Sequence, residues 1–193
     1  MTLDQIKIKR KNEKEANIMI KELIKRPVQL KQQDFKPGKM LIYSYAPKYD
    51  KNPYDMSPLI MVLGRTKKHT LGWSINWTPP KMRQKVLGYI MKKNKRNIEH
   101  GRPIEIDYRT IKKIIKGLGP VIRLYLNNRI SRKGVSIPSY DYNKTINLRA
   151  ENFIGISAEE AWKMAVKKYN SKKSKKSKTF NGKKVYKRKG RKG

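Results

Sequence analysis

Hydrophobic positions follow a helical period at the start of the chain and a strand period soon afterwards. Between residues 3 and 25, apolar side chains recur every three or four positions, which predicts an N-terminal helix that ends before Pro27. Three short apolar or alternating runs follow, and they predict strands at Lys39–Tyr45, Leu59–Leu63 and Leu71–Trp77. Because the links between these runs are short, we expect a small, partly antiparallel β-sheet or barrel.

Helical spacing returns after the predicted strands. Thr78 is predicted to be the N-cap of a helix that begins with Pro79 and Pro80. Its hydroxyl can accept a hydrogen bond from a backbone N–H of the first turn, and proline is tolerated there because these positions need no backbone N–H. A second helix is predicted to begin near Asp107, and a third to cover Val121–Arg129. The fold class that follows is α+β, with the sheet first and the helices after it.

The end of the folded body is predicted to contain a short β stretch and one more helix. The β stretch is expected within Val135–Leu148, between turn-forming residues. Ser157 and Glu160 have the spacing of a capping box, which predicts that a helix begins there. The residues predicted to face inward from this helix are Ala161, Trp162, Ala165, Val166 and Tyr169.

Composition changes sharply near residue 171. The last 23 residues contain 12 Lys or Arg, no acid and three apolar side chains. Such a segment buries too little apolar surface to offset the entropy of ordering it, so we expect it to be disordered when free. The sequence therefore predicts an N-terminal helix and linker at 1–35, an α+β body at 36–170 and a disordered basic tail at 171–193.

The charge of the chain points to a polyanionic partner. Its 49 Lys and Arg against 14 Asp and Glu give a formal net charge of +35. A net charge of +35 balances the phosphates of roughly 17 base pairs of duplex DNA. Lysine outnumbers arginine, 36 to 13, and lysine supplies point charge rather than the bidentate geometry that reads guanine. We therefore expect duplex DNA as the partner, with its ends as one candidate location, held through phosphates and without sequence preference.

Two stretches of the body lack acids, and they form the predicted binding surface. No acid occurs between Asp55 and Glu99 or between Asp107 and Asp141. The body residues predicted to contact DNA are Arg65, Lys67, Lys68, Lys81, Arg83, Lys85, Lys92, Lys93, Arg109, Lys112, Lys113, Lys116, Arg123, Arg129 and Arg132. The tail residues predicted to do so are Lys172, Lys173, Lys175, Lys176, Lys183, Lys184, Lys187, Arg188, Lys189, Arg191 and Lys192.

The residues with catalytic potential are few. The chain has no cysteine, and its two histidines, His69 and His100, are not spaced as metal ligands. Glu105 and Asp107 near Lys112 are the nearest approach to a nuclease-like carboxylate pair, but they fit a strand end and a helix cap better. We therefore expect no enzymatic activity and no cofactor, metal or small-molecule substrate. The apolar runs of the chain are also too short to span a membrane.

Two features have more than one interpretation. The predicted helices on either side of residues 117–120 have the proportions of a helix-turn-helix, which would place Arg123, Asn127, Asn128, Arg129 and Arg132 on a DNA-reading helix. Aromatic residues interleaved with basic ones indicate either core and protein contacts or a stacking platform for unpaired bases. These aromatic residues are Tyr43, Tyr45, Tyr49, Tyr54, Trp73, Trp77 and Tyr89.

Several motifs resemble those of a phage protein family. They are KPGKM at 36–40, IYSYAPK at 42–48, PYD at 53–55, SPLI at 57–60 and LGWSINWTPPKMR at 71–83, with weaker likeness at 120–131 and 160–162. Together they resemble the DNA end protector or head completion proteins of tailed, myovirus-type bacteriophages over roughly residues 36–170. The family motifs define no catalytic or base-reading residue, so none is assigned here by resemblance.

The resemblance implies a non-enzymatic structural protein of the virion. Such a protein would act on packaged DNA or at the head portal, first in the infected bacterial cytoplasm and then in the particle. Its partners would be DNA and the portal, neck or other head structural proteins. Two alternatives stay open from the sequence: a structural head–tail connector or baseplate component without a role at DNA ends, and a helix-turn-helix regulator.

Overall fold

The structure is a computed structural model that describes residues 18, 27–48, 53–106, 108–116, 118, 121–146, 148 and 150–167. The predicted tail at 171–193 lies outside the described residues, as does Tyr169. The predicted N-terminal helix at 3–25 also lies outside them except for Ile18, which is helical.

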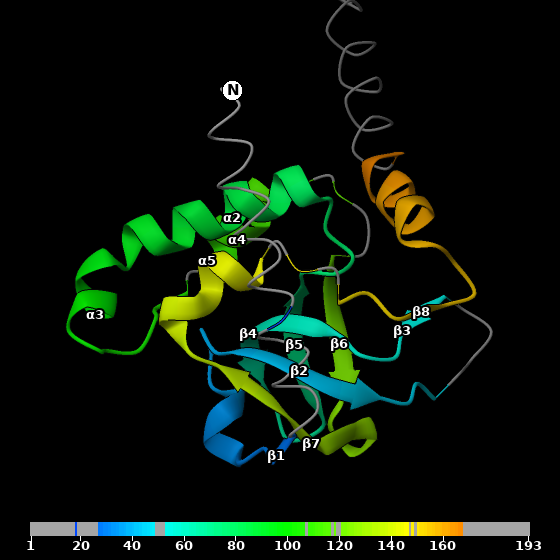
Figure 1. The fold of residues 1–193 in the computed structure, drawn as a ribbon, viewed down its shortest axis with the longest axis horizontal. Helices are drawn as coiled ribbons and strands as arrows, with labels where there is room; N and C mark the ends of the chain where they lie inside the picture. Colours follow the sequence, from blue (N-terminus) through cyan, green and yellow to red (C-terminus); the bar gives the residue numbers. More distant parts are fainter. Residues whose placement is uncertain are drawn as a thin grey trace, which may run out of the picture.

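A six-stranded antiparallel sheet organises the body (Figure 1). Its spatial order is β1–β7–β2–β4–β5–β6, so β2 and β4 lie at the centre. The strand bounds are β1 Val28–Gln29, β2 Met40–Tyr45, β4 Leu59–Arg65, β5 His69–Ser74, β6 Ile122–Leu126 and β7 Ile130–Ile137. The predicted α+β class is confirmed, and the sheet is open rather than a closed barrel.

Side chains of the central strands alternate between two faces, as expected for strands buried on both sides. The larger hydrophobic cluster contains Met40 and Ile42 from β2 and Leu59, Met61 and Leu63 from β4. The smaller cluster contains Leu41 and Tyr43 from β2 and Ile60 and Val62 from β4, together with Leu30, Phe35 and Tyr125. The sheet therefore separates two apolar layers of unequal size.

Most of the described helices cover the face with the larger cluster. These elements are α2 Pro80–Lys93, α3 Lys95–Glu99, α4 Tyr108–Ile114, η3 Ser139–Asp141, α5 Tyr142–Thr145 and a helix at 158–167. They insert Val86, Ile90, Ile111, Tyr142 and Ala161 into the larger cluster. The opposite face is covered by the short helix η1 Gln32–Phe35, which buries Phe35 in the smaller cluster.

Two further features complete the β structure: a second, two-stranded sheet and the short helix η2. The short strands β3 Tyr54–Asp55 and β8 Phe153–Ile154 pair with each other in a second, two-stranded sheet. The short helix η2 Asn127–Arg129 connects β6, at one edge of the main sheet, to β7, near the other edge. The chain thus crosses from one side of the sheet to the other through a single turn.

The predicted helix at Val121–Arg129 is wrong, because this segment forms β6 and then η2. Its apolar residues fit both periods, and strand pairing with β5 buries Tyr125 in the smaller cluster while Leu124 is left 65% exposed. Without a second helix, the helix-turn-helix hypothesis is also wrong. The predicted β stretch at Val135–Leu148 is displaced: β7 begins at Ile130, and helices follow Ile137.

Of the two helix caps predicted from the sequence, the one at Thr78 is wrong and the one at Ser157 is confirmed. The N-cap of α2 is Pro79 without a side-chain hydrogen bond. Thr78 instead donates its hydroxyl to the Ser74 carbonyl and accepts a hydrogen bond from Trp73 Nε1 at 2.8 Å. The capping box is confirmed, since Glu160 accepts hydrogen bonds from the backbone N–H and the hydroxyl of Ser157.

A close backbone approach in β7 gives a test of the sheet. An ideal Cβ built on Gly134 would lie 2.5 Å from the Ile42 carbonyl oxygen and 2.7 Å from Leu30 Cδ1, whereas one on Gly64 meets nothing within 4 Å. We expect Gly134→Ala to lower the free energy of unfolding by about 1–3 kcal/mol, because the β2–β7 ladder must move apart. Gly64→Ala should leave it unchanged or slightly raised. Urea unfolding of both variants measures the difference, and equal stabilities would contradict the expected close packing.

Candidate nucleic-acid interface

A groove without acidic side chains opens on the face covered by η1. It consists of two adjoining hollows of about 640 and 950 Å³, which share Gln32, Phe35, Arg65, Lys67 and Asn127 in their lining. Its cationic lining residues are Lys31, Lys36, Arg65, Lys67 and Arg132. We call this feature the basic groove.

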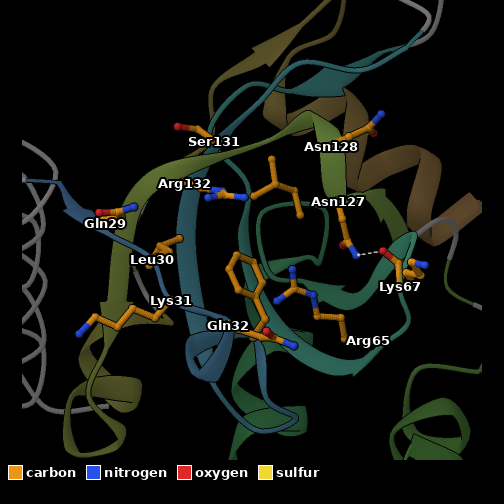
Figure 2. A pocket seen from close by; sticks show the side chains of 12 residues that line it. Gln29, Leu30, Lys31, Gln32, Arg65, Lys67, Asn127, Asn128, Ser131 and Arg132 are labelled. Atoms are coloured by element: carbon orange, nitrogen blue, oxygen red, sulfur yellow. Dashed lines mark hydrogen bonds between the residues drawn. The ribbon is translucent and has the colours of Figure 1, made fainter.

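The cations of the basic groove come from segments far apart in the sequence. Lys31 and Lys36 flank η1, Arg65 and Lys67 belong to the hairpin between β4 and β5, and Arg132 belongs to β7. Figure 2 shows that the side chains of Arg65 and Arg132 project into the hollow from different sides, while Lys31 lies at its margin. Within the described part of the chain, no ion pair uses any of these five cations. Their charge is therefore available to an anion.

An aromatic ring supports one of the two arginines. The Arg65 guanidinium lies 4.3 Å from the centroid of the Phe35 ring, which is buried in the smaller cluster. Such a cation–π contact holds the guanidinium plane over the ring and leaves its edge N–H groups for another partner. Arg65 is thus oriented before any ligand arrives.

Asn127 fixes the turn that carries Lys67 and Lys68. Its Nδ2 donates to the carbonyl oxygens of Thr66 and Lys67 at 2.9 and 3.1 Å, and its Oδ1 accepts from the Thr70 hydroxyl at 2.7 Å. The backbone N–H of Asn127 donates to the Lys68 carbonyl at 3.0 Å. With its side-chain groups used in this way, Asn127 holds the groove together rather than presenting its amide to a base.

The exposed cations among the predicted body residues divide into two surfaces. Arg65, Lys67, Lys68, Arg129 and Arg132 are exposed around the basic groove or on η2 and β7 beside it. A second group is exposed on the helices that cover the opposite face of the sheet, and it comprises Lys81, Lys85, Lys92, Lys93, Arg109, Lys112, Lys113 and Lys116. The two acid-free stretches therefore do not form one continuous surface. Lys31 and Lys36 complete the groove but lie outside both stretches, so the sequence reasoning missed them.

Arg83 is in the interior, which corrects its inclusion among the DNA contacts. Its guanidinium is paired with Glu151 at 2.6 Å, and the two side chains are 2% and 6% exposed. Arg83 also donates to the carbonyl oxygens of Thr78, Leu148 and Asn76, at 2.7, 3.1 and 3.2 Å. A buried guanidinium with these partners stabilises the fold and does not reach a phosphate.

Arg123 lies in a small pocket lined by aromatic side chains. The pocket has a volume of about 160 Å³ and lies between β6, β3 and the end of β2. The Arg123 guanidinium is 3.9 Å from the centroid of the Trp77 ring. We call this feature the aromatic pocket and define it by Tyr45, Tyr54, Trp77, Arg123 and Tyr125.

Asp55 also borders the aromatic pocket, but its carboxylate is already satisfied. It accepts hydrogen bonds from the Asn76 side chain and from the backbone N–H groups of Ser57 and Asn152. Burial raises the pKa of Asp55 above its usual value, and these three hydrogen bonds oppose that rise. Asp55 is therefore a structural residue that fixes β3 beside Asn76.

The core interpretation is confirmed for three of the aromatic residues, while the stacking interpretation stays a prediction. Tyr43, Trp73 and Trp77 are buried in the body. Tyr45 and Tyr54 are half-buried and line the aromatic pocket. Tyr89 on α2 is 37% exposed, and Tyr49 lies outside the described residues.

Neither a metal centre nor a membrane span is found in the described ranges. They hold no group of three or more His, Cys, Asp or Glu side chains that could bind a metal ion. Among the same residues, no helix is both long and apolar enough to cross a membrane.

These features define an α+β protein with cationic surfaces suited to a nucleic-acid backbone. A family model described as the phage T4 terminal DNA protecting protein matches residues 4–173, and the chain belongs to this family. No curated protein and no solved structure matches the chain. The predicted resemblance is confirmed, and the match also includes the N-terminal segment that the motifs at 36–170 left out. The chain is thus a bacteriophage protein of a DNA-protecting, structural class.

Removal of the buried guanidinium tests its structural role. We expect Arg83→Ala to lower the free energy of unfolding by about 3–5 kcal/mol, because Glu151 is left buried without its partner. Lys85→Ala, on the same helix and exposed, removes the same charge and should change stability by less than about 0.5 kcal/mol. Thermal and urea unfolding report both values. An Arg83→Ala protein as stable as Lys85→Ala would contradict the structural role.

Proposed function

We propose that this protein binds duplex DNA near its end through phosphate contacts, without reading the sequence, and thereby shields the terminus of packaged phage DNA. The observation that supports this most directly is the basic groove, in which five cations from separate segments surround a hollow lined by no acid. The description of the matched family supports the choice of DNA termini. This role requires binding and exclusion rather than catalysis.

The chemistry of the groove suits a sugar–phosphate backbone. Its lining combines cations with the amides of Gln29, Gln32 and Asn128 and with apolar floor residues. Lysine and arginine neutralise phosphates and release condensed counterions, which makes affinity strongly dependent on salt. Uncharged amides hydrogen-bond phosphate or sugar oxygens of any sequence. The exposed cations of α2 and α4, and those predicted in the tail, would add to the overall attraction.

We further propose that the protein acts at the head portal, with the portal, neck or other head structural proteins as its partners. The helix at 158–167 supports such docking, because Met164 and Val166 are 51% and 36% exposed on it. Val166 had been predicted to face inward, and only Ala161 and Ala165 are fully buried there. A structural connector without a role at DNA ends is the second candidate that this exposed apolar surface favours.

Protection of linear duplex DNA from an exonuclease that starts at ends tests the proposed function. We expect the full chain to protect, and the variant Arg65→Glu/Lys67→Glu/Arg132→Glu to lose most protection. In titrations, the slope of log affinity against log salt should fall by roughly 2 to 3 in this variant, because each lost phosphate contact contributes about 0.9.

The matched control reverses three cations of the helical face, as Lys85→Glu/Lys92→Glu/Lys112→Glu, and has the same net charge. It should keep most of the protection. Equal losses in the two variants would show that charge alone, and not the groove, determines binding. Binding by the unmodified chain that does not change between low and physiological salt would refute phosphate neutralisation.

A further inference from the structure

The aromatic pocket has the size of a site for one planar ring. Its volume is about 160 Å³, and a cavity of roughly 150 Å³ is known to hold a single benzene molecule. Most of its lining residues come from β6, which is an edge strand of the main sheet, from the short strand β3 and from the end of β2. The space therefore accepts one base but not a base pair.

The wall of the pocket contains a guanidinium that lies over an indole ring. Phe153 packs edge-on against Trp77 with ring centroids 4.9 Å apart, and the Arg123 guanidinium covers Trp77 at 3.9 Å. Arg123 itself lines the pocket, so the stack can continue on its other face. Guanidinium planes and aromatic rings are the surfaces on which proteins stack unpaired bases.

A hydrogen-bond donor at this wall is unused. Trp77 Nε1 is buried and has no partner among the described residues. Buried N–H groups are almost always hydrogen-bonded, so such an exception calls for an explanation. A base offers ring nitrogens and carbonyl oxygens as acceptors, which this N–H can reach once the Trp77 side chain shifts toward the pocket, because Nε1 is buried in the free protein.

The aromatic pocket and the basic groove border the same small apolar cluster. Phe35 in the groove, then Tyr43, Tyr125 and finally Tyr45 in the pocket form a row of rings, with successive centroids 6.4, 5.9 and 5.1 Å apart. Arg123 lies in β6 and the groove residue Asn127 directly follows that strand, four residues further on, so the two are separated by at most about 13 Å. A stacked DNA strand covers that distance with about four nucleotides.

We propose that the aromatic pocket binds the unpaired base of a terminal nucleotide, stacked on the Arg123–Trp77 pair, while the phosphates of the same strand lie in the basic groove. This inference rests on the proposed function and adds to it a means of distinguishing an end from continuous duplex. Internal base pairs cannot enter the pocket without being broken. A frayed or single-stranded terminal base enters it at little cost.

The test compares two duplexes of equal length, one with a single unpaired nucleotide at each end and one with each end closed by a hairpin. The unmodified chain should bind the open-ended duplex about tenfold more tightly, as expected for one stacked base. With 2-aminopurine as the unpaired nucleotide, binding should quench its fluorescence. Equal affinity for both duplexes, or no quenching, would overturn the inference.

Arg123→Leu should abolish the preference and the quenching, while binding to long circular duplex and its salt dependence stay nearly unchanged. Arg129→Leu is the matched control, because it removes one exposed arginine from the adjacent η2. It should keep the preference for the open-ended duplex and the quenching of 2-aminopurine. Tyr54→Ala is a second pocket variant, for use if Arg123→Leu does not fold, and it should weaken the preference.

The outcomes separate the inference from the proposed function. If the unmodified chain fails to bind any linear or circular duplex, the proposed function is wrong and the pocket assignment falls with it. If duplex binding persists and Arg123→Leu retains the end preference, only the pocket assignment is wrong. If Arg123→Leu retains the end preference and the quenching but prevents incorporation into phage particles, the pocket is a protein-docking site and the inference is overturned.

Discussion

The buried guanidinium of Arg83 joins parts of the chain that would otherwise have little reason to meet. It holds the turn between β5 and α2 through the carbonyl oxygens of Asn76 and Thr78, and the segment after α5 through Leu148 and Glu151. Trp162 extends the same network, since it lies 5.2 Å from the guanidinium and donates its Nε1 to the Asn76 carbonyl. The last described helix is thereby fixed to the sheet. Because Trp77 lies in the same turn, this network also sets the wall of the aromatic pocket.

The parts of the fold that could be predicted are those with one clear period. β2, β4 and β5 were found because their apolar residues alternate or run continuously, and the capping box at Ser157 marked the last helix. Val121–Arg129 could not be assigned correctly, since its apolar residues satisfy a helical stripe and a strand equally. Pairing with β5 and burial of Tyr125 decided between them, and both are long-range effects that a local pattern does not contain.

The candidate site was predictable only in part, for a similar reason. A count of charges along the chain identifies cations but not the depth at which each one lies, so Arg83 and Lys85 appeared equivalent. The basic groove brings Lys31, Arg65 and Arg132 together from three separate segments, and no spacing in the sequence reveals that convergence. The helical cations form a second surface on the other side of the sheet, which the positions of the cations along the chain do not separate from the first.

The turn η2 has a mechanical consequence. Because the chain passes directly from β6 to β7, the sheet has a seam between β6 and the end of β2 that no strand ladder closes. Across this seam the Leu126 N–H donates to the Tyr45 hydroxyl at 3.4 Å, and beside it the Ala46 N–H donates to the Arg129 carbonyl at 3.2 Å, which continues the pairing of β2 with β7. Each contributes about 0.5–1.5 kcal/mol to stability. The seam is therefore closed by single hydrogen bonds and by the edge-on packing of Tyr45 against Tyr125, with ring centroids 5.1 Å apart, rather than by a strand ladder.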